Sequence, residues 1–233
     1  MSYDVDAHVP LPTGRRLVIS DIHGCAKTLD ALIQQLDLTF SDQLFFLGDY
    51  INKGSDSLGV LNCLQGLIDQ GYNVFPLMGN HDLMMFQYLE TRGEALADKL
   101  TELNGPGFIR DQIHEFEKYR GFLVQLAGFY VTGDFLLVHA GFDFSRSDPF
   151  DDLSSMLNIR EFEYDQKKAN SKRIVHGHYP HSLGEIQAAI RNRSDIIPLD
   201  NGCVYKNREG QANLLCLNLD TFKLWVQPNI ENQ

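Results

Sequence analysis

The chain has 233 residues, of which 43% are hydrophobic and 11% are aromatic. This is enough apolar material to bury a full core, and we expect one domain over residues 1–233. The 20 basic and 31 acidic residues give a formal charge of −11, which argues against extended binding to nucleic acid or to an anionic membrane. A small phosphorylated substrate is compatible with this charge, because bound cations can dominate a local field.

The four cysteines form no C-x-x-C pair, so neither a zinc knuckle nor a disulfide framework is indicated. The first twelve residues carry Asp4, Asp6 and His8 in place of a basic region followed by an apolar run, and we interpret this stretch as a tail. No window reaches membrane-spanning length. We therefore expect a cytoplasmic protein with reduced thiols and no membrane partner.

In the first third of the chain, short apolar runs alternate with amphipathic stretches, which is typical of an α/β domain. Residues 17–19 are predicted to form a strand, and apolar residues at helical spacing over 29–36 predict a helix after it. Residues 44–47 and 58–68 repeat this strand and helix. A third strand is expected over 73–78.

The rest of the chain changes from helix to strand. Residues 83–120 are rich in helix formers and are interrupted only by the Asn-Gly-Pro-Gly turn at 104–107, so we predict a helical, lid-like segment. Residues 129–131 and 135–138 flank Thr-Gly-Asp and predict a β-hairpin. The run 145–155 is polar, and we place it on the surface. Further strands are expected over 173–175, 196–199, 214–219 and 224–226.

Five of the apolar runs end in a short polar cluster, and the glycines among them permit tight turns. The clusters are Asp21-Ile22-His23-Gly24, Gly48-Asp49, Gly79-Asn80-His81-Asp82, His139-Ala140-Gly141 and His176-Gly177-His178. Each cluster alone is explained by a turn, a helix cap or a histidine bonded to a carbonyl. Turns alone give no reason for five recurrences, whereas ligands bind beyond the carboxyl ends of strands in α/β sheets. We therefore expect the clusters to converge on one site.

These clusters offer carboxylates, an amide oxygen and neutral imidazoles. This mixed set suits manganese, iron, zinc or cobalt, and it is too rich in nitrogen for calcium. Two ions are needed to use all the ligands, and such pairs lie about 3.5–4 Å apart, where they clamp a phosphoryl group and ionise a water molecule. A bridging carboxylate is then required, and Asp49 stands between the other clusters in the sequence.

The clusters resemble the phosphoprotein phosphatase branch of the calcineurin-like metallophosphoesterases over nearly the whole chain. The second cluster extends the match as Gly48-Asp49-Tyr50-Ile51-Asn52-Lys53-Gly54, and residues 156–160 and 199–204 match later segments of bacterial members. The resemblance implies one metallophosphoesterase domain of α/β class, in which a central β-sandwich is flanked by helices and carries the site at one rim.

The resemblance also implies a cofactor of two divalent metal ions, with manganese as the first expectation and iron, zinc or cobalt as alternatives. Each implied role falls on a residue of this sequence. The first ion would be held by Asp21, His23 and Asp49, and the second by Asp49, Asn80, His139 and His178. His81 would protonate the leaving group. The substrate phosphate would be contacted by Asn80, Lys53 and Arg160. His176 is left out of this set.

The second cluster departs from the protein phosphatase pattern, which has Asp-Arg where this chain has Asn52 and Lys53. The aspartate of those enzymes orients the catalytic histidine and raises its basicity, so a neutral partner leaves His81 a less favourably charged acid. Lysine also gives up bidentate phosphate contact. Variation at this place, and Asp82 at the end of the third cluster, resemble the diadenosine tetraphosphatases.

Three functions therefore remain open. The first is a Ser/Thr protein phosphatase-like phosphomonoesterase for a phosphoprotein or a phosphorylated small molecule. The second is a symmetrical diadenosine tetraphosphate hydrolase or a related nucleotide pyrophosphohydrolase, which would share the same attack by metal-activated water. The third is a catalytically silent binding protein, which is disfavoured because every expected metal ligand and His81 are retained.

Overall fold

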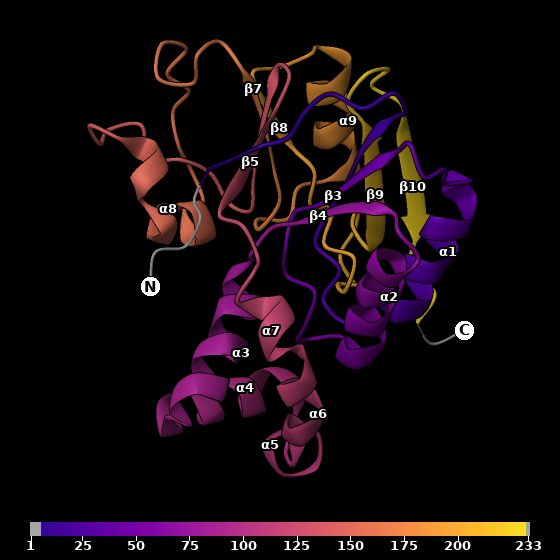
Figure 1. Ribbon diagram of the computed structural model, residues 1–233, viewed down its shortest axis with the longest axis vertical. Coiled ribbons are helices and arrows are strands. Elements are labelled where there is room, and N and C mark those ends of the chain that lie inside the picture. The colour runs from indigo at the N-terminus through magenta and orange to yellow at the C-terminus, as the bar shows by residue number, and fades with distance from the viewer. Residues whose placement is uncertain (1–5, 232–233) are drawn as a thin grey trace.

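The computed structural model describes residues 6–231, which form two five-stranded sheets with helices around them (Figure 1). The first sheet has the order β10-β9-β2-β3-β4, with β2, β3 and β4 parallel and β9 and β10 antiparallel. Its strands are β2 (Arg16–Ile19), β3 (Gln43–Phe46), β4 (Asn73–Pro76), β9 (Asn213–Asn218) and β10 (Leu224–Pro228). All five strands were predicted from their apolar runs, with ends that differ by one or two residues.

The second sheet has the order β1-β5-β6-β7-β8. Its strands are β1 (Asp6–His8), β5 (Phe129–Thr132), β6 (Phe135–Val138), β7 (Arg173–His176) and β8 (Ile196–Pro198). Strands β5 and β6 form the predicted hairpin, and β6, β7 and β8 are parallel.

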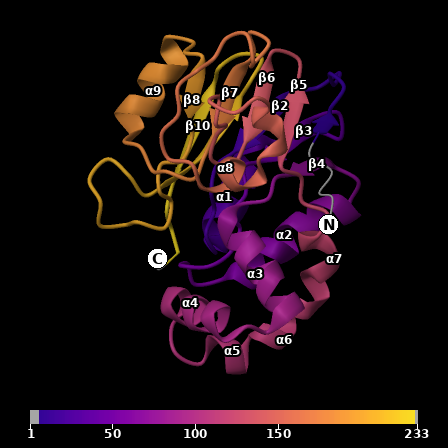
Figure 2. The same ribbon diagram turned by 90° about the vertical axis from the view of Figure 1, so that its left-hand side faces the viewer.

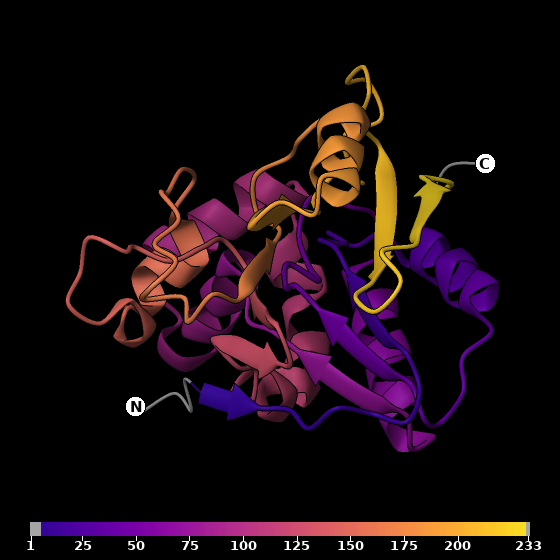
Figure 3. The same ribbon diagram turned by 90° about the horizontal axis from the view of Figure 1, so that it is seen from above.

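The prediction of a tail was wrong for His8. This residue ends strand β1, where it is paired with Val131 of β5, and three residues are too few to show the alternation that marks a strand. Residues 1–5, including Asp4 of the predicted tail, lie outside the described part of the chain. Figure 3 shows β1 and the pair β9 and β10 on opposite sides of the molecule.

The two sheets pack face to face because successive side chains of a strand point to opposite faces. Val18 of β2 lies in the core between the sheets, together with Leu137 of β6 and Val175 of β7. Its neighbours Leu17 and Ile19 point the other way, into a second core. The predicted β-sandwich is therefore confirmed, and it rests on alternation within each buried strand.

Helices cover the outer faces of the sandwich. Helices α1 (Ala26–Leu36) and α2 (Ser57–Asp69) pack on Leu17 and Ile19, and Asp56 caps α2 by accepting the backbone N–H of Gly59 at 2.7 Å. The outer face of the other sheet is covered by the segment that contains η2 (Pro149–Asp151) and α8 (Leu153–Asn158). The polar run 145–155, which was predicted to lie on the surface, thus holds η2 and the start of α8. Helix α9 (Leu183–Arg191) was also not predicted.

The predicted helical segment lies at one end of the molecule, beyond the rim of the sheets (Figures 1 and 2). It consists of α3 (Asn80–Thr91), α4 (Glu94–Asn104), α5 (Phe108–Asp111), α6 (Ile113–Phe116), η1 (Glu117–Tyr119) and α7 (Arg120–Leu123). Gly105 and Gly107 have φ values of 91° and 92°, which explains why the turn after α4 carries glycine. No helix among residues 6–231 is long and apolar enough to cross a bilayer.

Candidate metal centre

The five polar clusters all follow strand ends, and the structure brings them to one rim of the sandwich. Asp21 follows β2, Asp49 follows β3 and Asn80 follows β4, so these three come from one sheet. His139 follows β6 and His178 follows β7 of the other sheet. The candidate centre therefore lies across the join between the two sheets.

The first group of potential ligands comprises His23, Asp49 and His81, with ligand atoms within 4.8 Å of one another. His23 Nε2 is 3.4 Å from Asp49 Oδ2, and His81 Nε2 is 4.0 Å from the same oxygen. These distances place His81 near enough to be either a ligand or a proton donor beside the ligands.

The second group comprises Asp49, His139 and His178, also within 4.8 Å. His139 Nε2 is 3.7 Å from Asp49 Oδ1, 3.1 Å from His178 Nδ1 and 3.2 Å from Asn80 Oδ1. His178 Nδ1 is 3.1 Å from the same amide oxygen. Asp49 thus belongs to both groups and turns one oxygen toward each.

Backbone carbonyls fix two of the imidazole rings as acceptors toward the centre. His23 Nδ1 lies 3.1 Å from the carbonyl oxygen of Ile51, and His139 Nδ1 lies 2.8 Å from that of Leu47. A carbonyl oxygen only accepts, so each Nδ1 carries the proton and each Nε2 presents a lone pair. This arrangement is typical of histidines that bind metals.

Asp21 shows that the site suits a cation. Its Oδ2 accepts the backbone N–H of His178 at 2.9 Å, but its Oδ1 is buried and has no hydrogen-bond partner within residues 6–231. Burial, followed by the negative charges of Asp200 and Asp49, raises the pKa of Asp21 well above its usual value. A buried carboxylate in this state is stabilised by a positive ion, so the residues present fit divalent metals.

The local backbone is shaped around these side chains. A Cβ atom at Gly79 would collide with the carboxylate of Asp49, and one at Gly177 would collide with that of Asp21. Five residues of the site and its neighbouring turn have φ in the left-handed region. Few non-glycine residues adopt this conformation, and those that do cluster at functional sites. They are His23 (49°), Asp49 (52°), Asn52 (68°), Lys53 (69°) and His178 (68°).

His81 is held by a chain of amides that reaches into the helical segment. Its Nδ1 lies 3.1 Å from Asn52 Nδ2, and Asn52 Oδ1 accepts a hydrogen bond of 2.8 Å from Asn104 Nδ2. Asn104 Nδ2 also donates to the carbonyl oxygen of Leu100 at 2.8 Å, which fixes the orientation of both amides. Asn52 therefore donates to His81 Nδ1, and neutral His81 carries its proton on Nε2.

Asp82 does not replace the missing carboxylate partner of His81. Its Oδ2 accepts the backbone N–H groups of Asp49 at 2.7 Å and Gly79 at 3.0 Å, and its Oδ1 accepts that of Tyr50 at 3.1 Å. Asp82 thus ties the second cluster to the third. Burial lowers the pKa of His81 to about 4, and the charge of Lys53 adds to this effect.

The two predicted phosphate-binding cations lie differently. Lys53 Nζ is 2.9 Å from His23 Nε2 and 5.6 Å from the ring centre of Tyr205. An ion at the His23 lone pair and the Lys53 ammonium would repel each other, so metal binding there requires Lys53 to turn away. The Arg160 guanidinium is exposed and lies 5.7 Å from the ring centre of Tyr179. Burial, the neighbouring His139 and then the positive charge of Arg160 lower the pKa of His178 to about 4.

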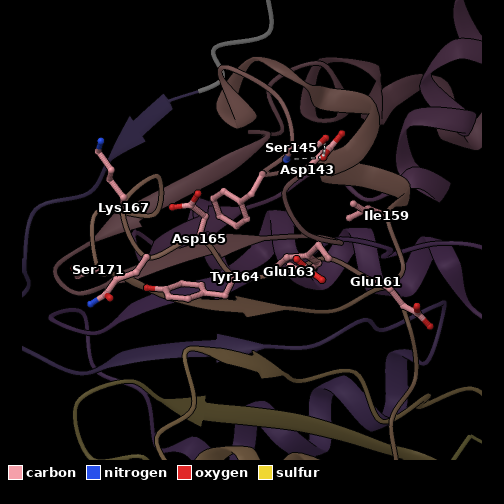
Figure 4. Close-up of a pocket in the computed structure, with 12 residues that line it drawn as sticks. Asp143, Ser145, Ile159, Glu161, Glu163, Tyr164, Asp165, Lys167 and Ser171 are labelled. Carbon is pink, nitrogen blue, oxygen red and sulfur yellow. Dashed lines mark hydrogen bonds between the residues drawn. The ribbon is translucent and has the colours of Figure 1, made fainter.

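An acidic cavity of about 1090 Å³ opens beside the Arg160 segment (Figure 4). Its walls include Phe162, whose ring centre is 5.5 Å from that of His176. Its carboxylates disfavour a polyanionic ligand, so the cavity is a poor place for phosphate. They belong to Asp143, Glu161, Glu163 and Asp165.

Comparison with known proteins decides the family, because the model of the calcineurin-like phosphoesterases matches residues 14–216. The chain belongs to this family. The resemblance that the clusters indicated is thereby confirmed, and with it a family of metal-dependent enzymes that hydrolyse phosphate esters and anhydrides.

Among curated relatives, this phosphoesterase is similar to several named symmetrical bis(5'-nucleosyl)-tetraphosphatase. The protein of Cellvibrio japonicus is 32% identical over 125 residues, which is 53% of this chain and 43% of that protein. The protein of Marinomonas is 37% identical over 90 residues, or 36% of this chain and 32% of that protein. The matched part thus spans less than half the length of these relatives.

Solved structures support the fold over nearly the whole chain. A candidate diadenosine tetraphosphatase has a TM-score of 0.64 at 21% identity and covers 99% of this chain and 100% of its own. A protein serine/threonine phosphatase of Saccharomyces cerevisiae has a TM-score of 0.65 at 14% identity and covers 97% and 84%. At these identities the likeness shows the fold alone.

Proposed function

We propose that the chain is a two-metal hydrolase that cleaves phosphoanhydrides, with dinucleoside polyphosphates as its substrate class. The observation that carries the proposal is Asp49, which belongs to both groups of potential ligands and turns one oxygen toward each. A carboxylate in this position can bridge two ions, and paired ions are a common device for phosphoryl transfer.

Each candidate residue has a role in this proposal. Asp21, His23 and Asp49 would hold one ion, and Asp49 with Asn80, His139 and His178 would hold the other. When bound, the ions supply a Lewis acid and a nucleophilic hydroxide at neutral pH. The Nε2–H of His81 would donate a hydrogen bond to the leaving oxygen. Asn80, Lys53 and Arg160 would orient the phosphate by hydrogen bonding and charge. Manganese is our first choice of metal, with iron, zinc and cobalt as alternatives.

The environment of His81 favours anhydrides over serine esters. Asn52 donates to His81 Nδ1 and so cannot stabilise a charged imidazolium. A nucleotide phosphate departs as a stable anion and needs little protonation, whereas a serine alkoxide needs the proton during bond cleavage. The names of the curated relatives agree with this preference. The four unpaired cysteines suit a reducing, cytoplasmic setting.

A turnover assay tests the proposal. The purified chain should be supplied with manganese and given diadenosine tetraphosphate, an aryl phosphate and a phosphoserine peptide. We expect the tetraphosphate to have the highest kcat/KM and the peptide the lowest. Preference for the peptide would favour a protein phosphatase, and metal binding without turnover of any substrate would favour a silent binding protein.

A further inference from the structure

A second cavity, of about 510 Å³, begins at Lys53. Its opposite wall is the loop that follows Asp200, and this loop contributes Tyr205, Lys206 and Arg208. The volume is within the range of about 300–1,000 Å³ that is usual for small-molecule sites. The cavity borders the candidate metal centre through Lys53, which lines the cavity and whose Nζ lies 2.9 Å from His23 Nε2.

The walls of this cavity are cationic in a protein of formal charge −11. Lys53, Lys206 and Arg208 form no ion pair with any of residues 6–231. The carboxylate of Glu231 also lines the cavity, but its Oε1 accepts the backbone N–H and the hydroxyl of Thr28, both at 2.9 Å. The cavity thus carries three cations against one carboxylate, and its walls keep a net positive charge.

Two of these cations, Arg208 and Lys53, lie over the aromatic ring of Tyr205. The Arg208 guanidinium lies 3.9 Å from the ring centre, and Lys53 Nζ lies 5.6 Å from it. Guanidinium and aromatic planes stack with nucleobases, while lysine and arginine bind phosphate oxygens. This combination matches the chemistry of a nucleotide better than that of a simple phosphate ester.

The charges of the two cavities also decide which of them a long anionic substrate enters from the metal centre. The cavity beside Arg160 carries four carboxylates and one lysine (Figure 4), whereas the cavity at Lys53 carries three cations and one carboxylate. A polyanion that leaves the metal centre is repelled by the first and attracted by the second.

We infer that the cavity formed by Lys53, Tyr205, Lys206 and Arg208 is a subsite for the part of a nucleoside polyphosphate that lies beyond the scissile phosphate. The inference rests on the proposed function and names its substrate class. Substrates with a charged chain and a base on the leaving side use this subsite, whereas small aryl phosphates do not.

The test is the double variant Lys206→Ala/Arg208→Ala, assayed in the full chain with manganese. Neither side chain forms an ion pair within residues 6–231, and the Arg208 guanidinium packs on the ring of Tyr205. We expect kcat/KM for diadenosine tetraphosphate to fall about tenfold or more, mainly through KM, because hydrogen bonds to charged groups contribute at this scale. Efficiency on an aryl phosphate should stay within about twofold.

The matched control is Arg193→Ala/Lys223→Ala. It removes the same net charge and two cations that lie over aromatic rings, Arg193 at 5.0 Å from Phe222 and Lys223 at 4.3 Å from Trp225. Both rings belong to the β9–β10 hairpin, and Asp220 of this hairpin accepts the backbone N–H of Arg16 at the start of β2, away from the carboxyl end of that strand. The control should leave both substrates unaffected.

The outcomes separate the inference from the proposed function. If the double variant loses the same factor on both substrates, or loses nothing on the tetraphosphate, the subsite is refuted while the hydrolase remains. If the unmodified protein cleaves aryl phosphate but not the tetraphosphate, the subsite is also refuted. If the unmodified protein cleaves neither, the proposed function itself has failed.

Discussion

Replacing Asn52 by aspartate should convert His81 into a stronger acid catalyst. In Asn52→Asp, one carboxylate oxygen can keep the hydrogen bond that Asn104 Nδ2 now donates at 2.8 Å, and the other can accept from His81 Nδ1, which now lies 3.1 Å from the amide nitrogen. The substitution therefore needs no change of shape. It replaces a donor with a negative charge at the ring nitrogen of His81.

The size of the effect follows from the protonation of His81. Its pKa of about 4 means that at pH 7 roughly one molecule in 10³ carries the charged ring. An opposite charge at this distance raises a histidine pKa by about 1–3 units, so the charged fraction should rise by about 10- to 10³-fold. General acid catalysis as a whole is worth about 10²–10⁴-fold, which sets the upper limit.

The assay compares kcat on a phosphoserine peptide and on an aryl phosphate across the pH range. The variant should gain at least about tenfold on the peptide and little on the aryl phosphate, since only the serine oxygen needs the proton. Asn62→Asp is the control, because Asn62 Oδ1 accepts the hydroxyl of Tyr119 and a carboxylate can do the same. An equal gain on both substrates, or none on the peptide, would refute the reasoning about His81.

Four further results are expected. Asp49→Asn should lower metal content and abolish activity, as measured by elemental analysis and turnover, whereas Asp82→Asn should do neither to the same degree. His81→Asn should lose about 10²- to 10⁴-fold in kcat with its metal content unchanged; loss of both would make His81 a ligand. A chelator should lower the melting temperature, because ions that bind only the folded state stabilise it. Burial opposes ionisation of Asp42, but hydrogen bonds from Arg15 hold the pKa of Asp42 below its usual range. Asp42→Asn should therefore lower the free energy of unfolding in urea by about 1 kcal/mol at pH 7. This loss should become progressively smaller below about pH 4.

The strands and the polar clusters could be predicted because both signals are local. An apolar run followed by glycine and a ligand-type residue is visible without knowledge of the partner strand, as at Asp21 and Asp49. Strand β1 was missed because its pairing with β5 is a tertiary choice that three residues cannot show. Periodicity was equally unable to show which sheet each strand joins. The single domain over 1–233 stays a prediction.

The residues around the site were harder to find than its ligands. Asn104 lies in a segment whose Asn-Gly-Pro-Gly sequence predicts a turn, and that turn is present. Its second contact, with Asn52, joins positions 52 residues apart, and no sequence signal marks such a pair. Tyr205 and Arg208 lie between β8 and β9 and were not among the predicted site residues, and only the cavity gives them a role. All three are polar side chains whose meaning depends on the fold.

The position of the candidate centre across the join of the two sheets has a consequence for synthesis of the protein. A nascent chain that has emerged only as far as His139 carries Asp21 and Asp49 but lacks His178, whose backbone N–H holds Asp21 in place. The full set of candidate ligands therefore exists only after β7 has emerged and joined β6. The proposed pair of ions would therefore be held only after β7 has joined β6, and it would not act as a template for the early steps of folding.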